Sequence, residues 1–253
     1  MFRHSIRDTF SWKDACHWFL LSFLSGNVNV GGYLACNRFV SHVTGFATLA
    51  GVDAAHGRFD AAIGILSVPI FFLLGVMISA SLIDRRDHRG QRPQYALVMG
   101  LVALCLFVAA LAGHFELFGK FGGELRLKRD YFFLALLCMA SGLQNAAVTT
   151  SSGSTIRTTH LTGLTTDLGI GLVKAFTFRK KHTVLTAEMR SNYTRIGTFL
   201  SFMAGSLVGA VLFLKVEYLG FLLPMSLALY AMGVAYATRP RAVSRVQGLP
   251  SLK

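Results

Sequence analysis

A His-x-Thr-Gly motif occurs twice in this chain, at residues 42–45 and again at residues 160–163. Imidazole rings can take up and release protons near neutral pH, and threonine hydroxyls can donate and accept hydrogen bonds. In the second copy Asp167 follows His160 by seven residues, which is two turns along nearly the same face of a helix. Their axial separation would be about 10 Å at 1.5 Å per residue, so this spacing predicts one elongated polar cavity and not a catalytic dyad.

Other polar side chains lie close to the two motifs in sequence. Amides occur in the apolar segments before them, as Gly26-x-x-Asn29 and as Gly142-x-x-Asn145, and Arg157 precedes the second motif. Because ionisable and amide groups are costly in lipid, we expect them to face a cavity or other helices. The candidate solute-binding residues are His42, Thr44, Gln144, Asn145, Arg157, Thr159, His160, Thr162 and Asp167.

The glycines of the motif, Gly45 and Gly163, allow two interpretations. Each could break a helix, or each could let two backbones come into close contact. If a half-helix begins there, its free N–H groups and the positive end of its dipole favour an anion, and Arg157 adds to that field. The sequence therefore indicates an anionic or zwitterionic solute.

A purely structural role is the alternative for these polar residues. Threonine hydroxyls in membrane bundles often bond only a backbone carbonyl or a neighbouring helix, at about 0.6–2 kcal/mol each. That role is favoured for any single threonine, whereas function and structure are equally supported for the paired His42 and His160. The asparagine and glutamine amides could likewise contact a ligand or another helix.

The sequence predicts no enzyme, metal or cofactor site. No cysteine, aspartate or glutamate stands at ligand spacing beside His42 or His160, and the four cysteines lie far apart. The spacing of serine, histidine and carboxylate residues does not suggest a nucleophile with its base. No G-x-x-x-x-G-K-[ST] sequence indicates nucleotide binding.

Six apolar segments dominate the chain, each near the ~20 residues that a membrane-spanning helix needs. The fourth in chain order becomes polar in its second half. The segments are Trp18–Asn37, Ala61–Ile83, Tyr95–Gly113, Tyr131–Ile156, Ile196–Leu214 and Tyr218–Thr238. We therefore expect an all-α integral membrane protein that forms a single membrane domain over residues 1–253, with the lipid bilayer as its surroundings.

The net charge of +13 could suggest a nucleic-acid partner. The basic residues are nevertheless spread over the gaps between apolar segments and do not gather in one domain. This distribution is typical of cytoplasmic loops under the positive-inside rule. We expect no nucleic-acid partner, and we expect both termini in the cytoplasm.

The two halves of the chain have similar sequences. Residues 39–51 and 158–169 match in register at the motif residues and beyond them, and each copy follows a Gly-x-x-Asn segment. Internal repeats in the bilayer are a common construction of secondary transporters. We assign repeat one to residues 15–113 and repeat two to residues 131–238.

The two polar repeat segments leave two topologies open. If they do not cross the bilayer, six crossings form an inverted 3+3 arrangement, in which only the basic loop at residues 120–129 lies outside. If both cross, eight crossings form two parallel 4+4 repeats, and the exception is the loop at residues 85–92. The polarity of these segments, which include Asp53 and Asp167, favours burial against protein or water. We prefer six transmembrane helices plus two re-entrant or discontinuous segments.

At these residues the chain resembles the YoaK-like family of small bacterial integral membrane proteins, a family of unknown function. The resemblance rests on Gly26-x-x-Asn29, on Ser-His-Val-Thr-Gly at residues 41–45, on Gly-Leu-Gln-Asn-Ala at residues 142–146 and on Arg-Thr-Thr-His-Leu-Thr-Gly at residues 157–163. Members often have an acidic residue at the position of Asn29 and an asparagine at that of Phe46, so the second repeat carries the intact pattern. The resemblance implies a six-span protein of the bacterial inner membrane and supplies no substrate.

We therefore interpret the chain as a small inner-membrane transporter or permease, with its solute passage between the two repeats. His160 or Asp167 would carry a coupling proton. The alternative is a sensor or assembly partner that transports nothing and uses the polar segments only to hold helices together. The solute is not identified by the sequence, and both a monomer and a homo-oligomer are compatible with it.

Overall fold

The computed structural model describes residues 12–123, 129–153, 156–177 and 182–238, and within these ranges the chain is helical, without strands. Most of the basic residues near the two termini, among them Arg3, Arg7 and Arg241, lie outside these ranges, as does the expected cytoplasmic location of the chain ends. The described elements are α1 (Trp12–Cys36), α2 (Val43–Ala55), α3 (Phe59–Leu82), α4 (Asp84–His88), α5 (Tyr95–His114), α6 (Arg129–Ser151), α7 (Leu161–Thr177), α8 (His182–Val216), the 3₁₀ helix η1 (Glu217–Phe221) and α9 (Leu222–Ala237).

Five stretches of the described chain are long and apolar enough to cross a membrane. They are 14–36, 59–88, 95–114, 131–151 and 185–237, and the last contains α8, η1 and α9. Large apolar side chains on these helices are exposed, among them Ile63 and Leu207, each 68%. Lipid can cover such side chains, and helices satisfy their own backbone groups in lipid. The chain is therefore a multi-pass, all-α membrane protein.

Helix α1 packs against α8, and the two run parallel. Phe19 lies beside Gly197 near the start of the contact, and Gly31 lies beside Phe213 near its end. Where the helices cross, a methyl group on Gly26 would overlap the carbonyl oxygen of Phe202. The two backbones are in contact there, and only glycine permits this approach.

Helix α8 also contributes a glycine to this crossing. A methyl group on Gly205 of α8 would overlap the carbonyl oxygen of Phe23 on α1. Two hydrogen bonds reinforce the contact: Asn27 Nδ2 donates to the Gly205 carbonyl at 3.4 Å, and Ser206 Oγ donates to the Gly26 carbonyl at 3.2 Å. Each helix therefore contributes one glycine that admits the backbone of the other.

Helix α3 packs against α6 in the same manner. The pair is parallel, because Gly64 lies beside Tyr131 and Asp84 lies beside Thr150. Each helix again contributes one glycine to the crossing. A methyl group on Gly142 would overlap the carbonyl oxygen of Phe72, and one on Gly75 would overlap that of Met139.

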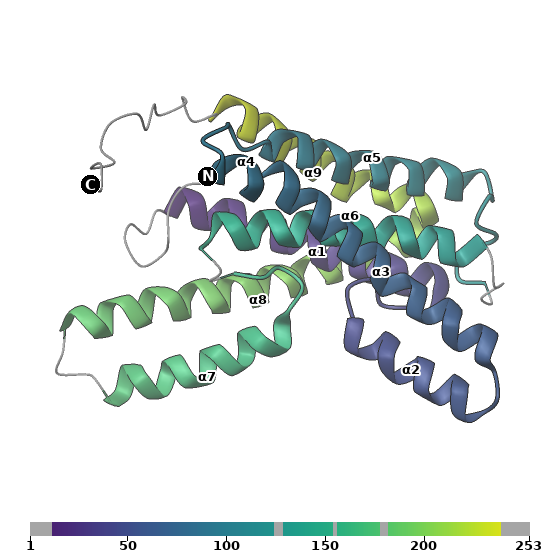
Figure 1. Ribbon diagram of the computed structural model, residues 1–253, viewed down its shortest axis with the longest axis horizontal. Coiled ribbons are helices and arrows are strands. Elements are labelled where there is room, and N and C mark those ends of the chain that lie inside the picture. The colour runs from purple at the N-terminus through teal and green to yellow at the C-terminus, as the bar shows by residue number, and fades with distance from the viewer. Residues whose placement is uncertain (1–11, 124–128, 154–155, 178–181, 239–253) are drawn as a thin grey trace, which may run out of the picture.

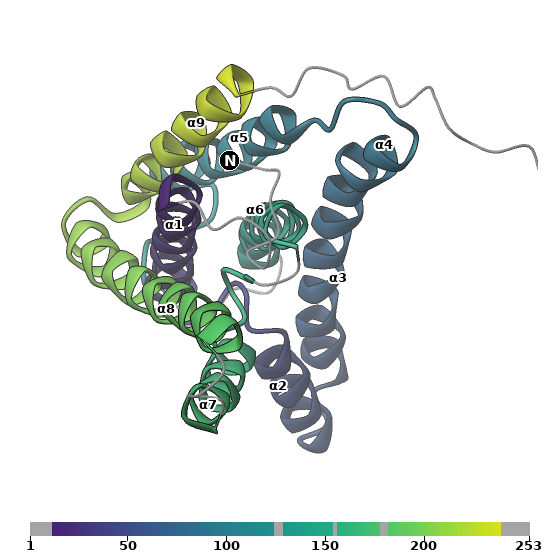
Figure 2. The ribbon, with the colours of Figure 1, turned by 90° about the vertical axis from the view of Figure 1, so that its left-hand side faces the viewer.

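The remaining long helices join these two pairs into one bundle. Helices α1 and α6 are antiparallel, since Gln144 bonds Leu21 whereas Leu137 lies near Gly32. Helices α5 and α9 also pack together and are antiparallel. Figure 2, which looks along the bundle, places α6 in the middle with the other long helices around it.

Helices α2 and α7, of 13 and 17 residues, are called the two short helices below; α9 is not counted with them because it continues directly from η1, and α4 is a single turn. Both begin near the middle of the molecule and run outward in opposite directions (Figure 1). Both lie on the same side of the bundle (Figure 2), where α2 packs on α3 and α7 packs on α8. At 13 residues, α2 is shorter than the ~20 residues of a full crossing.

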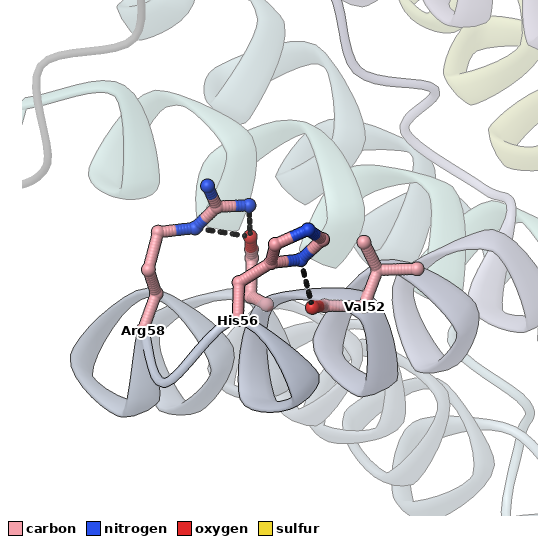
Figure 3. A network of polar contacts seen from close by, with 4 residues as sticks. Val52, His56 and Arg58 are labelled. Carbon is pink, nitrogen blue, oxygen red and sulfur yellow. Dashed lines mark hydrogen bonds and ion pairs between the residues drawn. The ribbon is translucent and has the colours of Figure 1, made fainter.

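At the outer end of α2, the Asp53 carboxylate forms an ion pair with Arg58. Arg58 turns back onto Asp53, donating to Oδ1 from Nη2 at 2.6 Å and from Nε at 3.0 Å (Figure 3). His56 caps the same turn, with its Nδ1 2.8 Å from the Val52 carbonyl oxygen. Gly57 then takes a positive φ of 74° and lets the chain turn into α3. The ion pair with Arg58 therefore gives Asp53 a structural role at the outer end of α2.

Alanine at any of the four crossing glycines (Gly26, Gly75, Gly142 and Gly205) is expected to lower the melting temperature of the protein in detergent. The added methyl must push two backbones apart, and overpacking of this kind costs about 1–3 kcal/mol. Gly233→Ala is the matched control, because among the described residues no atom lies within 4 Å of the place that its methyl group would take. Alanine should raise helix propensity there. Equal melting temperatures for Gly142→Ala and Gly233→Ala would contradict this packing.

Candidate functional site

A cavity of about 880 Å³ lies between the starts of α2 and α7. Its walls come from α1, α3, α6 and α8 as well as from the two short helices and the segments before them. The sequence-predicted residues that line it are His42, Thr44, Asn145, Arg157, Thr159, His160 and Thr162. Residues from both halves of the chain, more than 100 positions apart, are thus brought to one space.

Gln144 and Asp167, two further candidates, do not line this cavity. Gln144 is buried and donates its Nε2 to the Leu21 carbonyl oxygen at 2.6 Å and to Ser25 Oγ at 3.0 Å. Its amide therefore joins α6 to α1. Asp167 is exposed on α7 and makes no hydrogen bond or ion pair with the described residues.

Each motif histidine stands immediately before the first residue of its short helix. The first helical hydrogen bonds run from Phe46 N–H to the His42 carbonyl and from Leu164 N–H to the His160 carbonyl, both at 3.1 Å. The N–H groups before them in each first turn have no acceptor within the helix. Both short helices thus direct the positive end of their dipole to the centre of the molecule.

The motif glycines make room for the histidine rings. A methyl group on Gly45 would lie 2.6 Å from His42 Nδ1, and one on Gly163 would lie 2.6 Å from His160 Cε1. Neither glycine breaks a helix, since α2 and α7 begin two residues earlier. The close contact that the sequence predicted at these glycines is made with an imidazole and not with another helix backbone.

The two halves of the site differ in how their asparagines are used. Asn29 Oδ1 accepts hydrogen bonds from Val40 N–H at 3.1 Å and from Ser41 N–H and Oγ, each at 3.4 Å. In the second Gly-x-x-Asn sequence, the Asn145 Oδ1 atom is buried and has no hydrogen-bond partner in the described chain. The same is true of Thr158 Oγ1. The Asn29 oxygen therefore holds the chain before α2, whereas the Asn145 oxygen retains hydrogen-bonding capacity.

Two opposite charges line the cavity. Arg157 is exposed to it, and Asp84, which follows α3, accepts a hydrogen bond from Thr150 Oγ1 at 3.2 Å. Sequence reasoning missed Asp84 because it stands at the end of an apolar segment beside Arg85 and Arg86, where it is typical of a loop. Only the parallel packing of α3 and α6 shows that it reaches the cavity.

The site offers polar binding groups without the arrangement of a metal centre. Among the described residues, no group of three or more histidine, cysteine, aspartate or glutamate side chains could hold a metal ion. Imidazoles, hydroxyls, two amides, a guanidinium and a carboxylate instead surround an open volume. Such a set can orient a small polar or charged molecule.

The family described as "Protein of unknown function (DUF1275)" matches residues 17–235, which is most of the chain. The match includes both motifs, all the cavity-lining residues and the six long helices in nearly their full length. No curated protein and no solved structure matches the chain.

Gln144→Met and Asp167→Asn test the different roles of the two candidate residues that do not line the cavity. Gln144→Met removes two interhelical hydrogen bonds, each worth about 0.6–1.7 kcal/mol in a membrane bundle, so we expect a lower melting temperature in detergent. Asp167→Asn alters an exposed group without a described partner and should melt with the unaltered protein. A larger loss for Asp167→Asn than for Gln144→Met would contradict these placements.

Proposed function

We propose that the chain, which belongs to the DUF1275 family of proteins of unknown function, is a small secondary transporter or permease of the bacterial inner membrane. Within that family we assign it to the YoaK-like proteins that its motifs resemble. Its solute is small and carries an anionic group.

The observation that carries this proposal is the cavity itself, which is lined by both Thr-Gly segments. Transporters with inverted repeats bind their solute near the midplane, at the interface of the repeats and beside interrupted helices. Here two short helices begin at the centre of the bundle and contribute His42, Thr44, His160 and Thr162 to one space. Their positive ends favour an anionic group there.

The packing of the helices supports two inverted repeats. Exchanging α1 with α6, α2 with α7, α3 with α8 and α5 with α9 turns the contact of α1 with α8 into that of α6 with α3. The same exchange turns the contact of α2 with α3 into that of α7 with α8. Because α1 and α6 run antiparallel, the exchange inverts the direction of the chain. Parallel 4+4 repeats would require α1 and α6 to run in the same direction.

The glycine crossings support the same pairing at the level of single atoms. Gly26 meets the carbonyl of Phe202, and its equivalent Gly142 meets that of Phe72. Both phenylalanines line the cavity. The other equivalent pairs in its lining are Asn29 and Asn145, Phe39 and Arg157, Ser41 and Thr159, His42 and His160, Val43 and Leu161, and Thr44 and Thr162.

The distribution of basic residues orients the bundle. Arg85, Arg86, Arg89 and Arg92 lie at the end where α3 and α6 finish and where α1 begins. We assign this end to the cytoplasm by the positive-inside rule. Helix α9 also ends there, so both termini follow on the cytoplasmic side, with six crossings by α1, α3, α5, α6, α8 and α9.

Transport would follow from the two tightly packed helix pairs rocking against each other around the fixed cavity. The glycine crossings pair α1 with α8 and α3 with α6, so each rigid pair combines one helix from each repeat. The boundary between the two pairs runs through the cavity. His160 is the candidate for a coupling proton, because it lines the cavity whereas Asp167 does not.

A counterflow assay tests the proposal. The purified protein is reconstituted into liposomes that contain a mixture of unlabelled organic anions, amino acids and polyols, and entry of each labelled compound is followed. We expect at least one anionic or zwitterionic compound to enter faster than into protein-free liposomes. Thr162→Trp should abolish that entry, because the indole would obstruct the cavity beside the start of α7.

Thr165→Trp is the matched control for this experiment. Thr165 is exposed on the same helix, and it does not line the cavity. It should retain counterflow at the level of the unaltered protein. Entry equal to that of protein-free liposomes for every compound would contradict a transporter and favour the sensor or assembly partner, and equal activity of the two tryptophan variants would contradict this cavity as the passage.

A further inference from the structure

The two halves of the cavity differ in charge at one pair of equivalent positions. Three residues before each motif histidine stands Phe39 in the first half and Arg157 in the second, and both line the cavity. Phe39 is 45% exposed, and its ring stacks on that of Tyr33 with a centroid distance of 4.7 Å. One half therefore offers an aromatic face where the other offers a positive charge.

The guanidinium of Arg157 is not neutralised within the described part of the chain. No hydrogen bond or ion pair there involves its side chain. The carboxylate that lines the same cavity, Asp84, is bonded to Thr150. Helix α7 begins four residues after Arg157 and adds the positive end of its dipole. An unpaired cation beside a helix N-terminus, in a cavity of this size, is suited to an anionic group.

The wall of the cavity also has an apolar component. Phe72 and Val76 contribute to it from α3, and Phe202 contributes from α8. An inorganic anion would leave these side chains in contact with water only. A neutral solute would form no ion pair with Arg157, whose guanidinium makes none with the described residues. A solute that uses both features must combine an anionic head with an apolar body.

We propose that the solute of this cavity is an organic anion with an apolar body, of which an aromatic carboxylate is the simplest form. This proposal rests on the transporter function and names its substrate class. The carboxylate binds Arg157 and the first turn of α7, and the ring packs among Phe39, Phe72 and Phe202. Arg157 is the residue that selects for charge.

Isothermal titration calorimetry in detergent tests the proposal, with micelles that lack protein as the blank. Three probes are compared on the unaltered protein: benzoate, acetate, which keeps the anion without the ring, and benzyl alcohol, which keeps the ring without the charge. We expect benzoate to bind at least about tenfold more tightly than either, since a hydrogen bond to a charged group is worth a factor of this size. Acetate binding as tightly as benzoate would overturn the apolar requirement, and benzyl alcohol doing so would overturn the charge requirement.

Substitution of Arg157 gives the second arm. Arg157→Gln should weaken benzoate binding by about tenfold or more and leave benzyl alcohol binding unchanged. Arg58→Gln is the matched control, because Arg58 is exposed, pairs with Asp53 and lies off the cavity; it should bind benzoate as the unaltered protein does. Unchanged benzoate affinity in Arg157→Gln would overturn the proposal. The comparison of probes uses the unaltered protein and therefore does not depend on the folding of the variant.

Together, the binding and counterflow experiments distinguish a wrong solute class from a wrong transporter function. Failure of benzoate to bind at millimolar concentration, with counterflow of alanine through the same preparation, would overturn the organic-anion class and leave the transporter intact. Tight benzoate binding that depends on Arg157, without counterflow of benzoate, would support the binding site and contradict transport.

Discussion

The fold depends on backbone contact at two helix crossings, α1 with α8 and α3 with α6. In a bilayer, apolar side chains gain little by leaving lipid for one another, so helices associate through close van der Waals packing and hydrogen bonds. Reciprocal glycines supply that packing here: Gly26 and Gly205 at one crossing, Gly75 and Gly142 at the other. Each crossing fixes a parallel pair, and the antiparallel contact of α1 with α6 joins the pairs. These three contacts position the cavity at the centre of the molecule.

The cavity follows from the same geometry. After α1 and after α6 the chain does not continue into another full helix but returns to the middle of the bundle, where α2 and α7 begin. In the first half Asn29 holds this returning segment by bonding Val40 and Ser41. In the second half the equivalent Asn145 oxygen is left without a described partner, and Arg157 replaces Phe39. The Asn29 oxygen is thus used to hold the chain, whereas the second half keeps a buried amide oxygen and a guanidinium without described partners.

Much of this arrangement could be predicted from the sequence, because the repeated motif and the apolar segments are local patterns. The all-helical membrane architecture and the convergence of most motif residues on one space were predicted from these patterns alone. Gln144 could not be separated from Asn145, since adjacent helical residues point about 100° apart and only the neighbouring α1 decides which amide it receives. The spacing of His160 and Asp167 assumed one continuous helix, yet α7 begins at Leu161, so the helical register does not extend to the histidine. The place of Asp84 in the cavity lining could not be predicted from the sequence, because it depends on the tertiary packing of α3 on α6.

The proposed transport requires this cavity to open to both sides of the membrane. The most direct test is the labelling of a single cysteine, introduced as Thr162→Cys in a background without the four native cysteines, by a membrane-impermeant maleimide. The reagent is added to vesicles of known orientation from one side at a time. We expect labelling from either side, because the proposed rocking of the two helix pairs would expose the cavity to each side in turn. Labelling from one side only, with or without a bound organic anion, would contradict alternating access and identify a pocket with a single entrance.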